Sequence, residues 1–183
     1  MEENHFEDHS FTLLGGYSWQ KTHYQNFYMQ NFNFPSNDYT YNNMGTGQAL
    51  KDGRGTEYST ANESKLIGYF GRLNYSYKGK YMFAASLRHE GSTKFGADHK
   101  WGNFPSVSAA WNIKGEQFLE DTDVLSILKL RAGYGVTGTV PSDPYMSLNT
   151  LNFGTYVYYN NQWIKTIRPD SNANPELRWE KKK

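Results

Sequence analysis

The sequence contains no cysteine and no long hydrophobic run, and its charges nearly cancel. Without cysteine, disulfide bonds and thiolate metal sites are excluded. No stretch approaches the ~20 apolar residues of a membrane-spanning helix, and the acidic opening at Met1–Ser10 does not resemble a signal peptide. With 19 basic and 18 acidic residues, the chain also lacks the basic excess expected of a protein that binds nucleic acid.

Aromatic side chains are abundant instead, at 17% of the 183 residues, with 15 tyrosines, 11 phenylalanines and 5 tryptophans. Only 37% of the residues are hydrophobic, which at first suggests a water-soluble protein. A transmembrane β-barrel, however, is apolar at only every second position of each strand and carries long polar loops. The low hydrophobic content therefore does not exclude a barrel.

Apolar and polar side chains alternate in the segment from Asn74 to Gly96. One parity carries Tyr75, Tyr77, Tyr81, Phe83, Ala85 and Leu87, and the other carries Asn74, Ser76, Ala84, Ser86, Arg88 and Glu90. A period of two is that of a strand with one apolar and one wetted face. What the apolar face contacts, a protein core or lipid, decides the function.

The same alternation recurs along the chain and predicts about six strands. They cover approximately residues 10–20, 65–77, 81–90, 104–113, 127–136 and 151–160. Long connections follow the first, third and fifth strands, and shorter ones follow the second and fourth, the latter with room for one helical turn. Outer-membrane barrels have this asymmetry. We therefore predict an all-β fold, an open antiparallel meander of about five or six strands.

The connection at Lys78–Lys80 fixes the predicted register. If Tyr77 pairs with Tyr81, every apolar residue of one strand lies opposite an apolar residue of the next. Pairing Tyr77 with Lys80 instead would mix the two faces, which is costly. The turn type stays open, because Gly79 lies one place earlier than a common three-residue turn requires.

Aromatic residues are predicted near both ends of the strands, with small or aliphatic residues between them. Tyr75, Tyr77, Tyr81 and Trp111 fall near the short turns, and Trp19, Phe104 and Tyr134 fall near the long loops. Two such girdles around an apolar band of ~25 Å are typical of lipid-facing barrels. The alternative is a soluble all-β carbohydrate-binding module whose aromatics form its core; the loop asymmetry favours the barrel.

Five segments resemble, in order and spacing, those of SusC/RagA-type TonB-dependent outer-membrane transporters. They are GYFGRLNYSYKGKY (68–81), LRHEGSTKFG (87–96), WGNFPSVSAAWNI (101–113), LKLRAGYGVTG (128–138) and NPELRWE (174–180). Glu90, Thr93, Lys94 and Thr139 depart from the family by conservative changes. The resemblance implies uptake of glycans or oligopeptides across the cell outer membrane, driven by the TonB complex and assisted by a SusD-like surface lipoprotein.

The resemblance also implies a barrel larger than this chain, with about 22 strands and a plugged lumen. Residues 1–183 are then expected to be a segment of a large transmembrane β-barrel. On this reading the signal peptide, the plug domain and the closing strands are absent from residues 1–183. The partner of the apolar face is outer-membrane lipid.

No group of side chains in the sequence predicts catalysis, so we expect no enzyme activity, cofactor or metal. The candidates for substrate binding are Arg72, Arg88 and Arg131 on the polar parity and Tyr39, Tyr41, Phe95 and Trp101 in loops. Aromatic rings of this kind could stack on sugar rings. The alternatives are that the arginines only solvate the lumen or pair with plug carboxylates, and that the aromatics only brace their loops.

Overall fold

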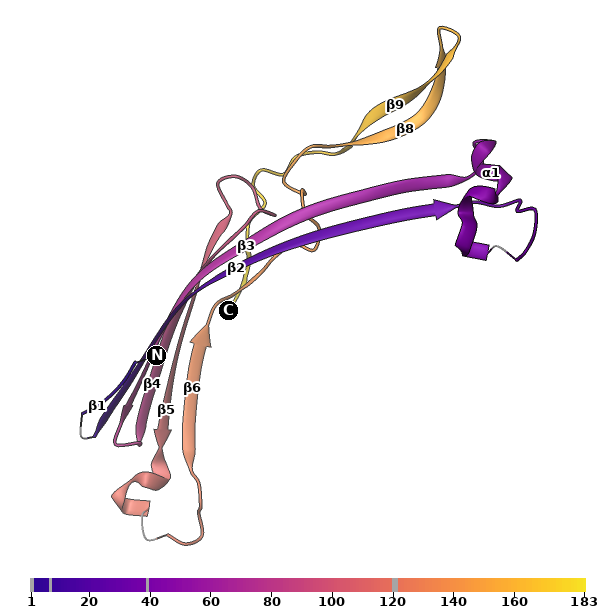
Figure 1. The fold of residues 1–183 in the computed structure, drawn as a ribbon. Helices are drawn as coiled ribbons and strands as arrows, with labels where there is room; N and C mark the ends of the chain where they lie inside the picture. Colours follow the sequence, from indigo (N-terminus) through magenta and orange to yellow (C-terminus); the bar gives the residue numbers. More distant parts are fainter. Residues whose placement is uncertain (1, 7, 39, 120–121) are drawn as a thin grey trace. The chain divides into compact units, whose positions relative to one another are not determined.

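The computed structural model describes residues 2–6, 8–38, 40–119 and 122–183, and most of its regular elements are strands. Six strands form one sheet in chain order (Figure 1). They are β1 (Glu2–Phe6), β2 (His9–Gln30), β3 (Thr56–Tyr77), β4 (Tyr81–Ser92), β5 (Trp101–Asn112) and β6 (Lys129–Gly135). The predicted antiparallel meander is confirmed.

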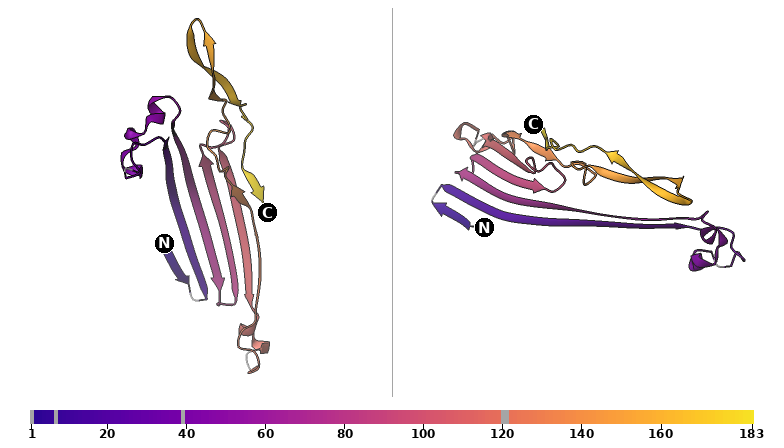
Figure 2. Two further views of the ribbon diagram at one scale, coloured as in Figure 1. Left: turned by 90° about the vertical axis from the view of Figure 1, so that its right-hand side faces the viewer. Right: turned by 90° about the horizontal axis from the view of Figure 1, so that it is seen from above.

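The predicted strand at 151–160 is present as β8 (Thr150–Tyr159), but it does not extend the meander. It pairs with β9 (Gln162–Ser171) as a separate hairpin (Figure 2). The two turn residues, Asn160 and Asn161, have φ of 52° and 61°, as the tight turns of β-hairpins require. β8 therefore pairs with its neighbour in sequence and not with β6.

The remaining elements are short. They are β7 (Thr137–Thr139) paired with β10 (Glu180–Lys182), the helix α1 (Gln48–Lys51), and the 3₁₀ turns η1 (Thr40–Thr46), η2 (Ile113–Gly115) and η3 (Gln117–Leu119). The last two lie between β5 and β6, where one helical turn was predicted. Within the described ranges, none of the helices has the length and apolar character needed to cross a membrane.

The chain divides into two compact units, and each is described by itself. The smaller, Lys21–Ser64, contains the end of β2, the start of β3 and the connection between them. Asn31 organises that connection: its Nδ2 donates to the carbonyls of Met44 (2.7 Å) and Gly47 (3.0 Å), and its Oδ1 accepts from the backbone N–H of Leu50 (2.9 Å). The larger unit holds Met1–Gln20 and Lys65–Lys183.

The register predicted for the larger unit is confirmed. Tyr77 pairs with Tyr81, and every later pair of β3 and β4 follows from it. At the turn, Lys78 and Gly79 have φ of 52° and 65°, and the Lys80 N–H donates to the Tyr77 carbonyl at 3.0 Å. Positive φ at both central residues is the requirement of a type I′ turn, which the sequence left open.

One face of the larger unit's sheet, the apolar face, is exposed. It consists of Phe11, Leu13, Tyr17, Trp19, Leu73, Tyr75, Phe83, Leu87, Val107, Trp111, Leu130 and Tyr134. Leu13 and Leu130 are 62% and 61% exposed. In the described part of the chain only Ala49, Phe95, Phe104 and Trp179 are buried hydrophobic residues. A water-soluble sandwich would instead bury this face against a second sheet.

The small core of the larger unit is the cluster of Phe95, Phe104 and Trp179. The rings of Phe95 and Phe104 lie 4.7 Å and 5.0 Å from that of Trp179. The prediction that Phe104 joins the outward girdle is therefore wrong. Phe104 pairs with Arg88, on the face opposite Leu87, and Trp179, 75 positions later, covers it.

Candidate functional site

The second face of the larger unit's sheet, the polar face, carries mostly small side chains. Its members include Ser10, Thr12, Arg72, Asn74, Ser76, Ala84, Ser86, Arg88, Ser106, Ser108, Ala110, Lys129 and Arg131, together with three larger apolar side chains, Phe70, Met82 and Phe104. Arg72 lies opposite Ser86, and Ser86 opposite Ser106, with the two hydroxyls 2.7 Å apart. The predicted placement of the three arginines opposite the apolar residues is confirmed by this register.

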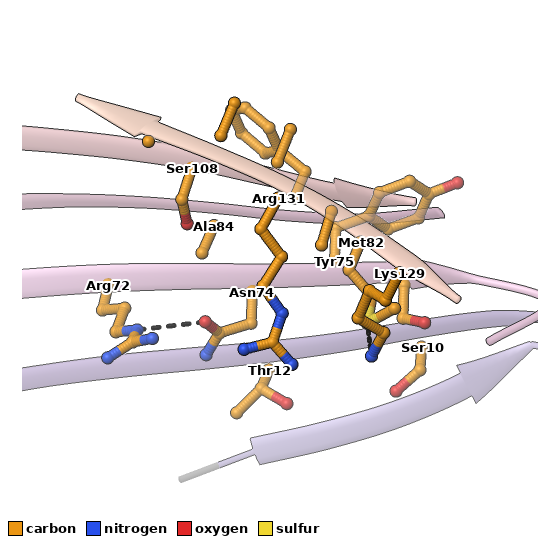
Figure 3. A pocket seen from close by; sticks show the side chains of 16 residues that line it. Ser10, Thr12, Arg72, Asn74, Tyr75, Met82, Ala84, Ser108, Lys129 and Arg131 are labelled. Atoms are coloured by element: carbon orange, nitrogen blue, oxygen red, sulfur yellow. Dashed lines mark hydrogen bonds between the residues drawn. The ribbon is translucent and has the colours of Figure 1, made fainter. Parts of the chain in front are cut away.

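A hollow of about 590 Å³ opens on the polar face (Figure 3). Its floor is formed by short side chains of β4 and β5, among them Ala84, Ser108 and Ala110. Arg72 reaches it from β3, and Lys129 and Arg131 reach it from β6. Long cationic side chains from two separate strands therefore line a hollow whose floor consists of short side chains.

The contacts of these cations within the described residues are weak. Arg72 Nε donates to Asn74 Oδ1 at 3.0 Å, a neutral amide. Lys129 Nζ lies 3.7 Å from the thioether sulfur of Met82, a poor acceptor. Asn74 was not among the predicted binding residues, although its parity could have identified it.

Arg88 is on the same face but does not line the hollow. Its Nη2 and Nε contact Glu90 Oε1 at 2.5 Å and 2.6 Å. Its guanidinium carbon also lies 6.0 Å from the ring centre of Phe70. A carboxylate therefore already neutralises Arg88, in contrast to Arg72 and Arg131.

The four predicted aromatic candidates are not gathered in one place. Phe95 is buried in the cluster with Trp179. Trp101 opens β5 and stacks on His89 at 4.6 Å with an interplanar angle of 4°. Tyr39 and the side chain of Tyr41 lie outside the described residues.

The loop between β4 and β5 is held by the segment Asn174–Glu180. The Gly96 N–H donates to the Leu177 carbonyl at 3.0 Å, and Trp179 Nε1 donates to the Lys100 carbonyl at 2.9 Å. A methyl group at Gly96 would meet the Pro175 oxygen at 1.8 Å. The close approach explains why glycine is needed there, and two of the resemblance-bearing segments thus pack on one another.

Aromatic rings line up at both ends of the apolar face. At the long-loop end, Tyr69 lies between Tyr17 (5.2 Å) and Trp101 (6.4 Å). At the short-turn end, Tyr81 stacks between Tyr77 and Trp111, with both ring centres 6.4 Å away. The short-turn girdle is the predicted one, with Tyr77, Tyr81 and Trp111. At the long-loop end the stacked rings are Tyr17, Tyr69 and Trp101, not the predicted Phe104, and Tyr134 lies level with Leu73, Ala85 and Val107.

Glu116, in the turn after β5, ties the short-turn girdle together. Its Oε1 accepts hydrogen bonds from Tyr81 Oη (2.8 Å) and Trp111 Nε1 (3.0 Å), and its Oε2 lies 3.5 Å from Lys80 Nζ. The hydrogen bond from Trp111, followed by that from Tyr81, holds the pKa of the Glu116 carboxyl below its usual range. Nothing in the alternation of apolar and polar residues predicts this role for Glu116.

The side chains of the polar face are suited to binding a polar ligand. Across the described ranges, no three histidine, aspartate or glutamate side chains come together as a metal site would need. The polar face offers cations, hydroxyls and an amide, whereas the opposite face offers mostly apolar and aromatic surface. A sheet with these two faces separates a wetted space from lipid.

The family described as TonB dependent receptor-like, beta-barrel, matches residues 3–183. The chain is 34% identical over 178 residues to TonB-dependent receptor P3 of Formosa agariphila, covering 97% of this chain and 17% of that receptor. It is 44% identical over 131 residues to TonB-dependent receptor SusC of Bacteroides thetaiotaomicron, covering 69% of this chain and 13% of that receptor. The chain thus spans less than a fifth of the length of these relatives.

Among solved structures, the RagAB peptide transporter superposes with a TM-score of 0.84, over 96% of this chain and 19% of the other. At 22% identity this likeness shows the fold alone. The family match extends over nearly the whole chain, and the exposed apolar face with its two girdles is the lipid-facing surface that the family requires. The chain therefore belongs to the TonB-dependent receptor-like β-barrel family of outer-membrane proteins.

Proposed function

We propose that the chain contributes barrel wall and extracellular loops to an outer-membrane transporter that takes up glycans or oligopeptides. In this proposal a SusD-like surface lipoprotein delivers the nutrient, and the TonB complex supplies the energy. The similarity to SusC and the fold shared with the RagAB peptide transporter support it. We assign no chemical reaction to the chain.

The observation that carries the proposal is the division of one sheet into two unlike faces. The exposed apolar patch is larger than those found on soluble monomers. It contains Leu13, Leu73, Leu87, Val107 and Leu130. Lipid is its matching solvent, and the opposite, hydroxyl-rich face then lines the lumen. No feature of the described residues favours the alternative of a soluble carbohydrate-binding module.

The predicted binding residues take different roles in this proposal. Arg72 and Arg131 contact what enters the lumen. Arg88, already paired with Glu90, maintains the wall. Phe95 braces its loop, and Trp101 anchors the wall at the membrane surface, where amphipathic rings are favoured.

The test is deletion of the gene that encodes the whole transporter, followed by growth on defined glycans and peptides as sole nutrients. We expect growth to fail on one nutrient class and to return when the gene is restored. Loss of the TonB complex should produce the same defect. Unchanged growth on every nutrient, with the protein recovered in a soluble fraction, would contradict the proposal.

A further inference from the structure

We infer that the hollow lined by Arg72, Lys129 and Arg131 binds a carboxylate. The inference rests on the proposed function, because it takes the polar face to be the lumen wall, and it deepens that function by naming the ligand chemistry of this site. Three observations support it: the cations share one hollow, they lack acidic partners among the described residues, and neutral donors lie beside them.

The three cations line one hollow because the register of the sheet places them on the same face. Lys129 and Arg131 are two residues apart on β6, so both side chains project from the same face of the sheet. Arg131 pairs with Ala110, and the neighbouring row runs through Asn74, Ala84, Ser108 and Gly133. These short side chains leave space above β4 and β5, and Figure 3 shows the Arg131 side chain crossing it toward Asn74 and Thr12.

No acidic side chain neutralises these cations in the part of the chain that the structure describes. The lining of the hollow contains no aspartate or glutamate, and Arg131 has no hydrogen-bond or ion-pair partner within the described ranges. Three other cations of β4 and of the turn between β3 and β4 are each paired with a carboxylate. The pairs are Arg88 with Glu90 (2.5 Å), Lys80 with Glu116 (3.5 Å) and Lys78 with Asp8 (3.2 Å). The hollow therefore differs from these neighbouring positions in having no carboxylate beside its cations.

An unpaired guanidinium is stable only while water solvates it. When the lumen is filled, that water is displaced, and a cation left without a partner becomes strongly destabilising. A carboxylate removes this cost, because a guanidinium can donate to both of its oxygens at once. What occupies the hollow must therefore bring negative charge with it.

Neutral donors complete the site. The hydroxyls of Ser10, Thr12 and Ser108 line the same hollow. Asn74 Oδ1 accepts from Arg72 Nε at 3.0 Å, which fixes the orientation of the amide, and its Nδ2 is a further donor for a ligand. A carboxylate can accept several such hydrogen bonds in addition to the charge pairs.

The carboxylate can come from two sources. It belongs either to the imported solute, as in a uronic-acid glycan or an acidic peptide, or to another part of the same transporter that enters the lumen. The chemistry at Arg131 is the same in both cases. The two sources differ in whether the site is filled before any solute is added.

The experiment uses the full-length transporter, purified in detergent, as wild type and as Arg131→Gln, Lys129→Gln/Arg131→Gln and Arg131→Lys. Arg168→Gln, on the hairpin strand β9, is the matched control because it removes the same charge outside the hollow. Binding of trigalacturonic acid and of a glutamate-rich hexapeptide is measured against neutral galactotriose. Thermal unfolding is measured without any solute.

If the solute supplies the carboxylate, an acidic probe binds the wild type and Arg131→Gln weakens it roughly 10-fold or more. Unfolding without solute is then unchanged. If the transporter supplies it, the double variant unfolds at a lower temperature without solute. In either case Arg131→Lys retains most of the wild-type behaviour and Arg168→Gln all of it.

The inference is overturned if the double variant matches the wild type in both measurements. It is also overturned if Arg131→Lys behaves like Arg131→Gln, because the side chain would then act through its shape and not its charge. Neither measurement needs TonB or uptake. Failure here therefore leaves the growth test of the proposed function unaffected.

Discussion

Glu116 shows how one carboxylate can set the edge of a membrane-facing surface. It accepts hydrogen bonds from two girdle residues, Tyr81 and Trp111, on strands that are neighbours in the sheet. Both donors favour the charged form of the carboxylate. The hydrogen bonds from both rings are therefore strongest while Glu116 is charged.

We predict that acid weakens this girdle. Because the pKa of Glu116 is lowered in the folded protein, its contribution to stability is fully present above the ordinary glutamate value of about 4.3 and is lost as the pH falls through the folded-state value. The melting temperature in detergent should therefore drop more steeply with acid for the wild type than for Glu116→Gln. Glu57→Gln, in the smaller unit, should keep the wild-type slope; equal slopes for all three proteins would refute the role of Glu116.

Ala84 and Ala85 give a matched test of the two faces, because they are adjacent, identical and on opposite sides of β4. Ala85→Glu places a carboxylate on the apolar face near the middle of the band, at a cost of up to ~2 kcal/mol. Ala84→Glu places it in the cationic hollow, where it should be tolerated or stabilising. Unfolding of the full-length protein in detergent measures both, and a greater loss for Ala84→Glu would reverse the assignment of the faces.

At the scale of the elements, alternation in the sequence predicted the strands where one face is apolar and failed where both faces are polar. It found β4 and β5 nearly to their ends. It placed only about half of β2 and β3, each of which is 22 residues long. Beyond Trp19 and before Ile67 the alternation disappears, although the strands continue. The division into units at Gln20 and Lys65 falls at the same points.

The same reasoning explains which parts of the site were predictable. Parity alone placed Arg72 and Arg131 on the polar face. It could not show that Arg88 is paired with Glu90 while the other two lack a carboxylate, because that depends on side-chain geometry. Nor could it pair Phe104 with Trp179, since that contact joins segments distant in the sequence.

Docking of Asn174–Glu180 on the loop between β4 and β5 is an element-scale contact that a single methyl group should break. Gly96→Ala would push a carbon onto the Pro175 carbonyl oxygen, so the two segments must separate. Overpacking of this kind costs roughly 1–3 kcal/mol. Limited proteolysis and unfolding of the full-length protein should show a more accessible loop at residues 93–100.

Gly71→Ala is the control for that substitution. Gly71 lies in β3 with open space where the methyl group would go, so proteolysis and unfolding should stay close to the wild type. If the two variants are equally resistant to protease, the segment Asn174–Glu180 does not hold the loop.

At the scale of the whole molecule, the 183-residue chain has too little buried surface to be stable in water. Its buried hydrophobic side chains in the described ranges are few, and they form one small cluster in the larger unit together with Ala49 in the smaller. The hydrophobic effect, which dominates the folding of soluble domains, requires a much larger core. Lipid or detergent on the apolar face must supply what the interior does not.

We therefore predict that residues 1–183, expressed alone, aggregate in water or remain soluble only with detergent. The apolar face would associate with other copies, and β1 and β6, at the two edges of the six-stranded sheet, would offer unpaired backbone groups for further pairing. Size-exclusion chromatography with and without detergent is the measurement. A sharp monomer peak without detergent, together with cooperative thermal unfolding, would show that the exposed face tolerates water and would favour a soluble binding module over a barrel wall.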